Sequence, residues 1–74
     1  MWIRNQDKDT MFNLNLCEKI CVIPGDVGNY SIVAYQNGNK HHIGYYDTEE
    51  EVNRAFQYIH DRMAWNITLI DMNV

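Results

Sequence analysis

The sequence has few of the features that stabilise a very small domain. Its 74 residues include two cysteines, one proline and four glycines, and no apolar run approaches the ~20 residues of a membrane span. On an extended strand Cys17 and Cys21 would lie about 13 Å apart, too far for a disulfide. A chain this short buries only about 60% of its unfolded surface. We therefore expect one marginally stable domain over residues 1–74, supported by oligomerisation.

Positive charge is also scarce. Ten acidic residues against six basic ones give a formal net charge of −4. Nucleic-acid-binding proteins neutralise phosphates with clustered Lys and Arg, so the balance argues against a nucleic-acid ligand. It favours a protein partner with a basic surface, or a role as a polyanion mimic. Because the first residues lack the charged and apolar regions of a signal peptide, we expect a cytoplasmic protein without a membrane partner.

Alternation and turn residues predict the first strands. Residues 2–6 fit a short strand, closed by a polar turn over residues 5–10. Residues 11–16 alternate, which predicts a half-buried strand with Phe12, Leu14 and Leu16 on one side. The apolar run over residues 20–23 ends at a turn signal, Pro24, Gly25 and Asp26.

The strongest turn signal is Asn37-Gly38, which favours a type I′ hairpin. Counting outward from a two-residue loop pairs Val33 with His42, Ile32 with Ile43, and Tyr30 with Tyr45. The expected core face then holds Tyr30, Ile32, Ala34, Ile43 and Tyr45, and the opposite face holds Ser31, Val33, Tyr35, Lys40, His42 and Tyr46.

A helix is expected to follow this hairpin. Thr48 and Glu51 form a capping box, and Glu50 and Arg54 stand one turn apart. The apolar residues recur at helical spacing and form one stripe: Val52, Ala55, Phe56, Ile59 and Met63. The expected fold is α+β, an antiparallel sheet of about four hairpin-linked strands packed by one C-terminal amphipathic helix.

The tail over residues 65–74 fits either a helix or a strand, and the sequence leaves both open. Its apolar residues are Trp65, Leu69, Ile70, Met72 and Val74, more than a free terminus usually carries. We expect the tail to pack on this domain or on a second copy, with Trp65, Leu69 and Ile70 as the contacts of a homo-oligomer.

Two cysteines and two adjacent histidines raise the question of a metal or a catalytic thiol. Adjacent residues on a strand face opposite sides, so His41 and His42 cannot both join Cys17 and Cys21 around one zinc ion. A Cys–His nucleophilic pair would also need an oxyanion site and a pocket, for which the sequence has no signal. We expect free thiols, no metal, no cofactor and no enzymatic activity.

The N-terminal and central motifs resemble those of a known family. They are Trp2-Ile3-Arg4-Asn5-Gln6-Asp7-Lys8, the residues Asn13 and Asn15, Gly44-Tyr45-Tyr46, and Thr48-Glu49-Glu50. Together they are similar to a family of small uncharacterised proteins from Gram-positive bacteria and their phages. The resemblance implies a gene of phage or mobile-element origin. Small acidic proteins from that source often inhibit host machinery, including immune systems, by stoichiometric binding.

These observations suggest a small binding or inhibitor protein, such as a counter-defence factor in the host cytoplasm. It would cover a host protein or sequester a small ligand. Because amphipathic aromatic residues are enriched at interfaces, the expected binding residues are Tyr35, Tyr46, His42 and Lys40. The alternative is a single-stranded nucleic-acid-binding module, because strands followed by a helix resemble dimeric single-strand-binding transcription cofactors. A third interpretation is a purely structural subunit.

Overall fold

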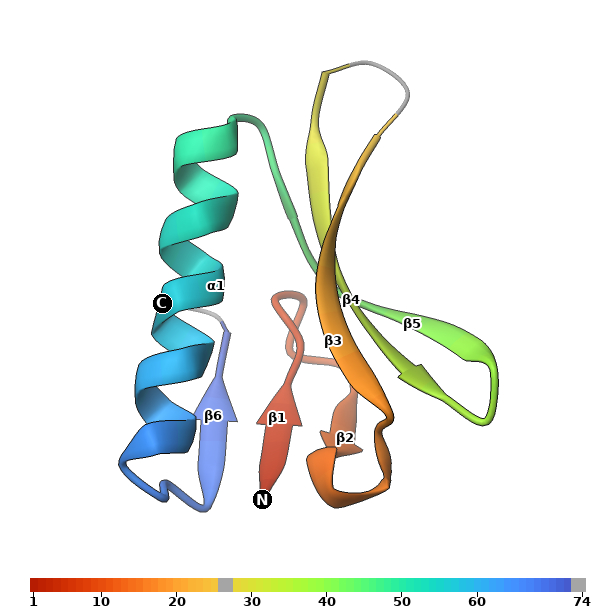
Figure 1. The fold of residues 1–74 in the computed structure, drawn as a ribbon, viewed down its shortest axis with the longest axis vertical. Coiled ribbons are helices and arrows are strands. Elements are labelled where there is room, and N and C mark those ends of the chain that lie inside the picture. The colour runs from red at the N-terminus through yellow and green to blue at the C-terminus, as the bar shows by residue number, and fades with distance from the viewer. Residues whose placement is uncertain (26–27, 73–74) are drawn as a thin grey trace.

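A computed structural model describes residues 1–25 and 28–72 (Figure 1). The predicted turn residue Asp26 and tail residue Val74 lie outside the described residues. The elements are β1 (Trp2–Arg4), β2 (Met11–Asn13), the 3₁₀ helix η1 (Leu14–Leu16), β3 (Lys19–Pro24), β4 (Tyr30–Gln36), β5 (Asn39–Tyr46), α1 (Glu49–Ala64) and β6 (Leu69–Asp71). The α+β class and the helix after the second hairpin are confirmed.

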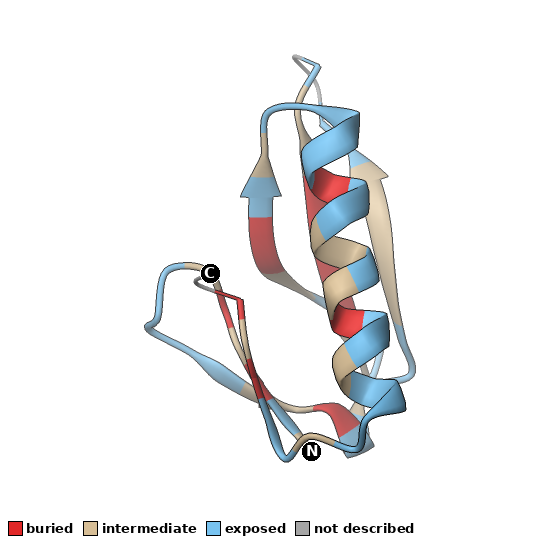
Figure 2. Ribbon diagram, turned by 90° about the vertical axis from the view of Figure 1, so that its left-hand side faces the viewer, coloured by how far each residue is buried: buried red, intermediate tan, exposed pale blue. Residues whose placement is uncertain are grey.

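The strands form two three-stranded sheets instead of the single sheet expected. The first has the order β2–β1–β6, and the second has the order β3–β4–β5. All pairs are antiparallel except β1 and β6, which run parallel. The helix α1 contacts all three strands of the β3–β4–β5 sheet, and Figure 2 shows it lying along that sheet. A parallel pair needs a long crossover connection, here through α1, which counting hairpins along the sequence cannot reveal.

The predicted strand over residues 11–16 is correct only as far as Asn13. The Asn13 side chain accepts a hydrogen bond of 3.0 Å from the backbone N–H of Asn15 and so caps η1. Asparagine side chains compete with strand pairing in this way. The turn separates two leucines that were expected on one side, because Leu14 is buried while Leu16 is 60% exposed.

The β4–β5 hairpin follows the predicted register near its turn and then departs from it. Asn37 and Gly38 have φ angles of 54° and 80°, as a type I′ turn requires, and Val33 pairs with His42. Beyond that pair the register shifts by one residue at Ile43, which is the extra residue of a β-bulge. The observed pairs are Ile32 with Gly44, Ser31 with Tyr45 and Tyr30 with Tyr46, so the predicted pairs Ile32–Ile43 and Tyr30–Tyr45 are wrong.

The bulge exchanges the faces of two tyrosines. Tyr45 was expected in the core, but it is 52% exposed on the opposite side of the sheet. Tyr46 was expected on the exposed side, but it packs against the core cluster. One inserted residue inverts the side-chain alternation of every position that follows it in the strand.

Both ends of α1 are capped by side-chain or backbone chemistry. The backbone N–H of Glu51 donates to Thr48 Oγ1 at 3.1 Å, and Arg54 pairs with Glu50 at 2.8 Å, which confirms both predictions. At the C-terminal end, Asn66 has a φ of 58° and its N–H donates to the carbonyl of Met63 at 3.1 Å. The N–H of Ile67 donates to the Arg62 carbonyl at 3.2 Å, which completes a Schellman motif.

The tail adopts the strand alternative over Leu69–Asp71. It pairs parallel to β1, with Leu69 beside Trp2 and Ile70 beside Ile3. An ion pair between Arg4 and Asp71 joins the same two strands. Ile70 is 1% exposed, so its side chain belongs to the core of this chain and is not available to a second copy.

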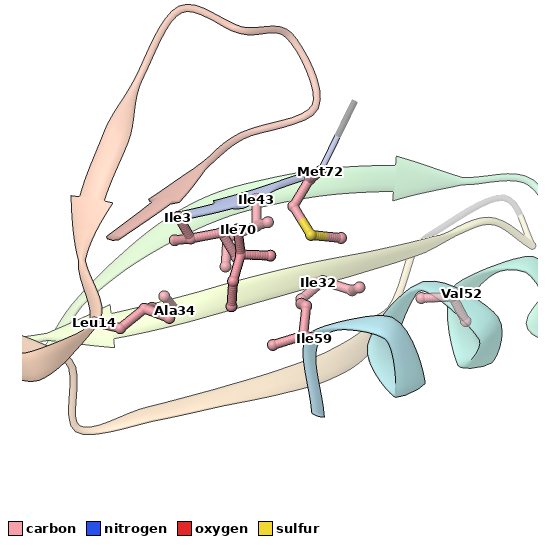
Figure 3. Packing of buried hydrophobic residues seen from close by; sticks show 9 residues of the cluster. All are labelled: Ile3, Leu14, Ile32, Ala34, Ile43, Val52, Ile59, Ile70 and Met72. Carbon is pink, nitrogen blue, oxygen red and sulfur yellow. The ribbon is translucent and has the colours of Figure 1, made fainter. Parts of the chain in front are cut away.

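Both sheets and α1 contribute to one hydrophobic core, which Figure 3 shows from close by. Its buried members are Ile3, Leu14, Ile32, Ala34, Ile43, Val52, Ile59, Ile70 and Met72. Along α1 the predicted stripe holds for Val52 and Ile59, which are buried, and for Ala55 and Phe56, which pack against the core, while Met63 is 44% exposed. Figure 2 shows buried and exposed positions alternating along α1. Within residues 1–25 and 28–72, no helix is long and apolar enough to cross a membrane.

Candidate ligand-binding face

The side of the β3–β4–β5 sheet that points away from the core forms a defined surface, called the outer face below. Side chains alternate along each strand, so every second row of paired residues belongs to it. Three rows make up the outer face: Lys19–Tyr35–Lys40, Cys21–Val33–His42 and Ile23–Ser31–Tyr45. The rows between them carry core residues such as Ala34 and Ile32.

An aromatic ring lies between two cations in the first row. Tyr35 on the central strand is paired with Lys19 on one side and Lys40 on the other. The Lys19 Nζ atom lies 4.7 Å from the centroid of the Tyr35 ring, a cation–π distance. Both lysines are exposed and Tyr35 is partly exposed. This row therefore presents an aromatic surface with positive charge on both sides.

A second aromatic group occupies the other two rows. The rings of His42 and Tyr45 are stacked, with centroids 5.1 Å apart and an interplanar angle of 17°. Residues three apart on a regular strand would face opposite sides, so this stack depends on the bulge at Ile43. Beneath it, Val33 is fully buried and Ser31 is 8% exposed. The stack lies on β5, next to the row positions of Val33 and Ser31 on the central strand.

The bulge is held by a residue from the turn between β1 and β2. The backbone N–H of Gln6 donates to the Ile43 carbonyl at 2.8 Å, and the N–H of Tyr45 donates to Gln6 Oε1 at 2.8 Å. These two bonds satisfy backbone groups that the irregular pairing leaves without a ladder partner. Gln6 therefore fixes the position at which Tyr45 turns to the outer face.

The outer face is positively charged although the chain is acidic. None of the described residues in its rows is Asp or Glu, while Lys19 and Lys40 belong to it. The acidic residues gather elsewhere, for example in the first turn of α1, which packs against the core side of this sheet. Glu18 adjoins the first row in sequence, but its carboxylate accepts a hydrogen bond of 2.9 Å from the Asn37 N–H. Asp47 follows the strand at the other end.

The structure brings together three of the four predicted binding residues. Tyr35, Lys40 and His42 share the outer face, whereas Tyr46 lies on the core side. There Tyr46 lines a hollow of about 380 Å³, together with Gln6, Glu51, Arg54, Ala55, Tyr58 and Met72. Burial raises the pKa of the Tyr46 hydroxyl. The sequence analysis missed Lys19 and Tyr45, since their placement depends on the β3–β4 register and on the bulge.

The two cysteines and His41 were the residues considered for a metal site or a catalytic thiol. Cys17 and Cys21 are free and half-buried, as predicted, and His41 packs on Phe12 at a centroid distance of 5.3 Å. Cys17 lines a groove of about 320 Å³ between α1 and β3 that His60 also borders. Burial raises the pKa of the Cys17 thiol, which disfavours the thiolate. In the part of the chain that the structure describes, no group of three or more His, Cys, Asp and Glu residues could hold a metal.

A separate apolar surface lies on the exposed side of the β2–β1–β6 sheet. Leu69, one of the predicted oligomer contacts, is 46% exposed there and borders a hollow of about 370 Å³ with Trp2, Met11 and Thr68. Trp65, the other predicted contact that stays accessible, is the C-cap residue of α1 and is 70% exposed. The prediction of self-association now rests on Leu69 and Trp65.

Comparison of the chain with protein-family models, curated proteins and solved structures found no significant match.

Proposed function

We propose that this chain is a small binding protein, and that it captures an anionic ligand with an aromatic part on the outer face. One observation carries the proposal: Tyr35 and the His42–Tyr45 stack share a surface with Lys19 and Lys40 and with no acidic side chain of the described strands. Aromatic rings bind flat groups, and flanking ammonium groups attract negative charge. Together they favour a ligand that has both a flat group and a negative charge.

The size of the outer face favours a small ligand over a large protein surface. Three strands about 4.8 Å apart and rows about 6.6 Å apart span about 10 by 13 Å between backbone positions. A standard protein interface buries about 800 Å² on each partner, several times that area. The sequence leaves two modes of action open, coverage of a host protein and sequestration of a small ligand. We therefore propose sequestration.

The proposed activity is stoichiometric binding without chemistry. A nucleophilic thiol needs a lowered pKa, and the pKa of Cys17 is raised by burial. The resemblance of the segment from Trp2 to Lys8 to proteins of Gram-positive bacteria and phages supports a role as a mobile-element inhibitor in the host cytoplasm, for example a counter-defence factor. Inhibition should then scale with the number of copies of the chain, and it should disappear in variants that lose the ligand.

Two planar probes of opposite charge test the proposal. Naphthalene-2-sulfonate and 2-naphthylmethylamine share one ring system, and each is titrated into the isotopically labelled chain by two-dimensional NMR. The sulfonate should shift the amide signals of Tyr35, His42 and Tyr45, and the amine should not. The Tyr45→Ala variant should lose this response, whereas Tyr58→Ala, on α1, should keep it. Equal shifts by both probes, or shifts confined to the two grooves beside α1, would overturn the proposal.

A further inference from the structure

The outer face has two separate ring positions, which suggests a ligand with more than one flat group. Tyr35 lies in the row next to the hairpin turn, and Tyr45 lies two rows further along, a separation of about 13 Å. Resting on the proposed function, we propose that the ligand is a single strand of nucleic acid a few nucleotides long. One base stacks on Tyr35, another stacks on Tyr45, and Lys19 and Lys40 pair with phosphates.

The open shape of the surface favours a strand over a free nucleotide. Pockets for small molecules enclose most of the ligand surface, whereas the outer face is the exposed side of a sheet. Among the described hollows, only the groove between α1 and β3 includes a residue of this face, Lys19; the other two lie beside Tyr46 and on the β2–β1–β6 sheet. An open platform allows a chain to enter at one end and leave at the other, and several aligned stacking positions compensate for weak contact at each.

The same shape favours a single strand over a duplex. Bases stack on protein rings only when they are splayed out from their neighbours, which paired bases in a duplex are not. Sheets with aromatic residues on adjacent strands bind single-stranded RNA in this manner. Tyr35 on β4 and Tyr45 on β5 have such an arrangement.

Local charge, and not the net charge of −4, governs this surface. The acidic first turn of α1, Glu49 to Glu51, lies on the other side of the β3–β4–β5 sheet from Lys19 and Lys40. The acidic neighbour of the first row is Glu18, whose carboxylate accepts a hydrogen bond of 2.9 Å from the Asn37 N–H. The net charge of the whole chain therefore does not describe the charge of the outer face.

The salt dependence of binding gives a quantitative test. A fluorescein-labelled oligothymidine of about ten nucleotides is titrated with the full chain, and binding is followed by fluorescence anisotropy. Two neutralised phosphates give a slope of about −1.4 in log affinity against log salt, so affinity should fall about 25-fold between ~20 mM and ~200 mM salt. Lys40→Gln should reduce the slope to about −0.7. The control Arg54→Gln removes the same charge from α1 and should leave the slope unchanged.

Stacking is tested separately from charge. Tyr35→Ala and Tyr45→Ala should each weaken binding about tenfold at fixed salt, with no change in slope. Tyr58→Ala serves as the matched control and should bind as the native chain does. A circular dichroism melt of each variant shows whether the fold is retained, and Tyr→Phe at the same positions keeps the ring if the alanine variant unfolds.

The outcomes separate this inference from the proposed function. Absence of oligothymidine binding at ~20 mM salt, where phosphate contacts are strongest, overturns the nucleic-acid ligand. If naphthalene-2-sulfonate still shifts Tyr35 and Tyr45 signals, the outer face survives as a binding surface for another anion. If thymidine monophosphate competes as strongly as unlabelled oligothymidine, the ligand is not a strand. If polyglutamate competes as strongly, base stacking does not contribute to binding. If binding survives both tyrosine substitutions, the ligand does not bind on the outer face.

Discussion

The ring of Tyr46 folds back over Gly44 on the core side of β5. A Cβ atom built on Gly44 would lie 2.8 Å from the Tyr46 hydroxyl oxygen and 3.0 Å from its Cε2 atom. The two residues are neighbours on one face because they are two apart in the strand, after the bulge. Glycine at this position therefore provides the space into which Tyr46 turns, while Tyr45 points outward.

We expect Gly44→Ala to destabilise the chain by displacing this ring. Overpacking of this kind costs about 1–3 kcal/mol, which urea unfolding can measure. The matched background is Tyr46→Leu, which removes the ring. If the ring is the cause, the cost of Gly44→Ala should be smaller in that background, as a double-mutant cycle reports. An equal cost in both backgrounds would contradict the role given to Tyr46.

The sequence predicted the elements whose signals are local. The turn at Asn37-Gly38 and the cap formed by Thr48 and Glu51 depend on residues within a few positions of one another, and both are present. The start of η1 was missed, although the Asn13 side chain that caps it is also a local signal. Each of these features depends on hydrogen bonds or backbone angles of residues that are close together in the sequence.

The bulge and the second sheet could not be predicted in the same way. The bulge depends on Gln6, which is 39 residues from Tyr45 and bonds its backbone N–H. The pairing of β6 with β1 joins Ile70 to Ile3 across almost the whole chain. Pattern counting assumes uninterrupted pairing between neighbouring strands, so it placed Tyr46 on the outer face instead of Tyr45 and left Lys19 out.

Asn66 should determine how stably α1 ends. Its φ of 58° is in the left-handed region, where glycine and asparagine are tolerated and other residues are strained. We expect Asn66→Ala to lower the free energy of unfolding by about 1 kcal/mol and Asn66→Gly to leave it nearly unchanged. Thermal melts of the two variants provide the comparison. Equal stability of the alanine and glycine variants would contradict the assignment of Asn66 as the residue that ends the helix.

Asp9 should titrate below its ordinary pKa of 3.8. The hydrogen bond from the Asn5 side chain, at 2.8 Å, lowers its pKa most, followed by the bond from the Thr10 hydroxyl, at 3.0 Å. The folded state therefore favours the carboxylate. Its contribution to stability is present above about pH 4 and is lost as the pH falls through the lowered pKa. Carbon-detected NMR titration measures this pKa directly, and Thr10→Val should raise it. Titration of Asp9 at the ordinary value would refute the prediction.

We expect the chain to self-associate through the exposed side of the β2–β1–β6 sheet. Large exposed apolar side chains on a small protein favour association: Leu69 on this side of the sheet is 46% exposed, and Trp65 at the end of α1 is 70% exposed. Sedimentation velocity of the native chain should show a species larger than a monomer, which the double substitution Trp65→Ser and Leu69→Ser should abolish. Leu16→Ser alters another exposed leucine as a control and should have no effect. A native chain that stays monomeric at millimolar concentration would contradict this expectation.

If the outer face binds the ligand, then Tyr45 touches it and Tyr46 does not. Intermolecular nuclear Overhauser effects between bound naphthalene-2-sulfonate and the tyrosine rings report which rings touch the ligand. We expect contacts from the ligand protons to Tyr35 and Tyr45 and none to Tyr46. Contacts to Tyr46 and Tyr58, without any to Tyr45, would place the ligand beside α1 and refute binding on the outer face.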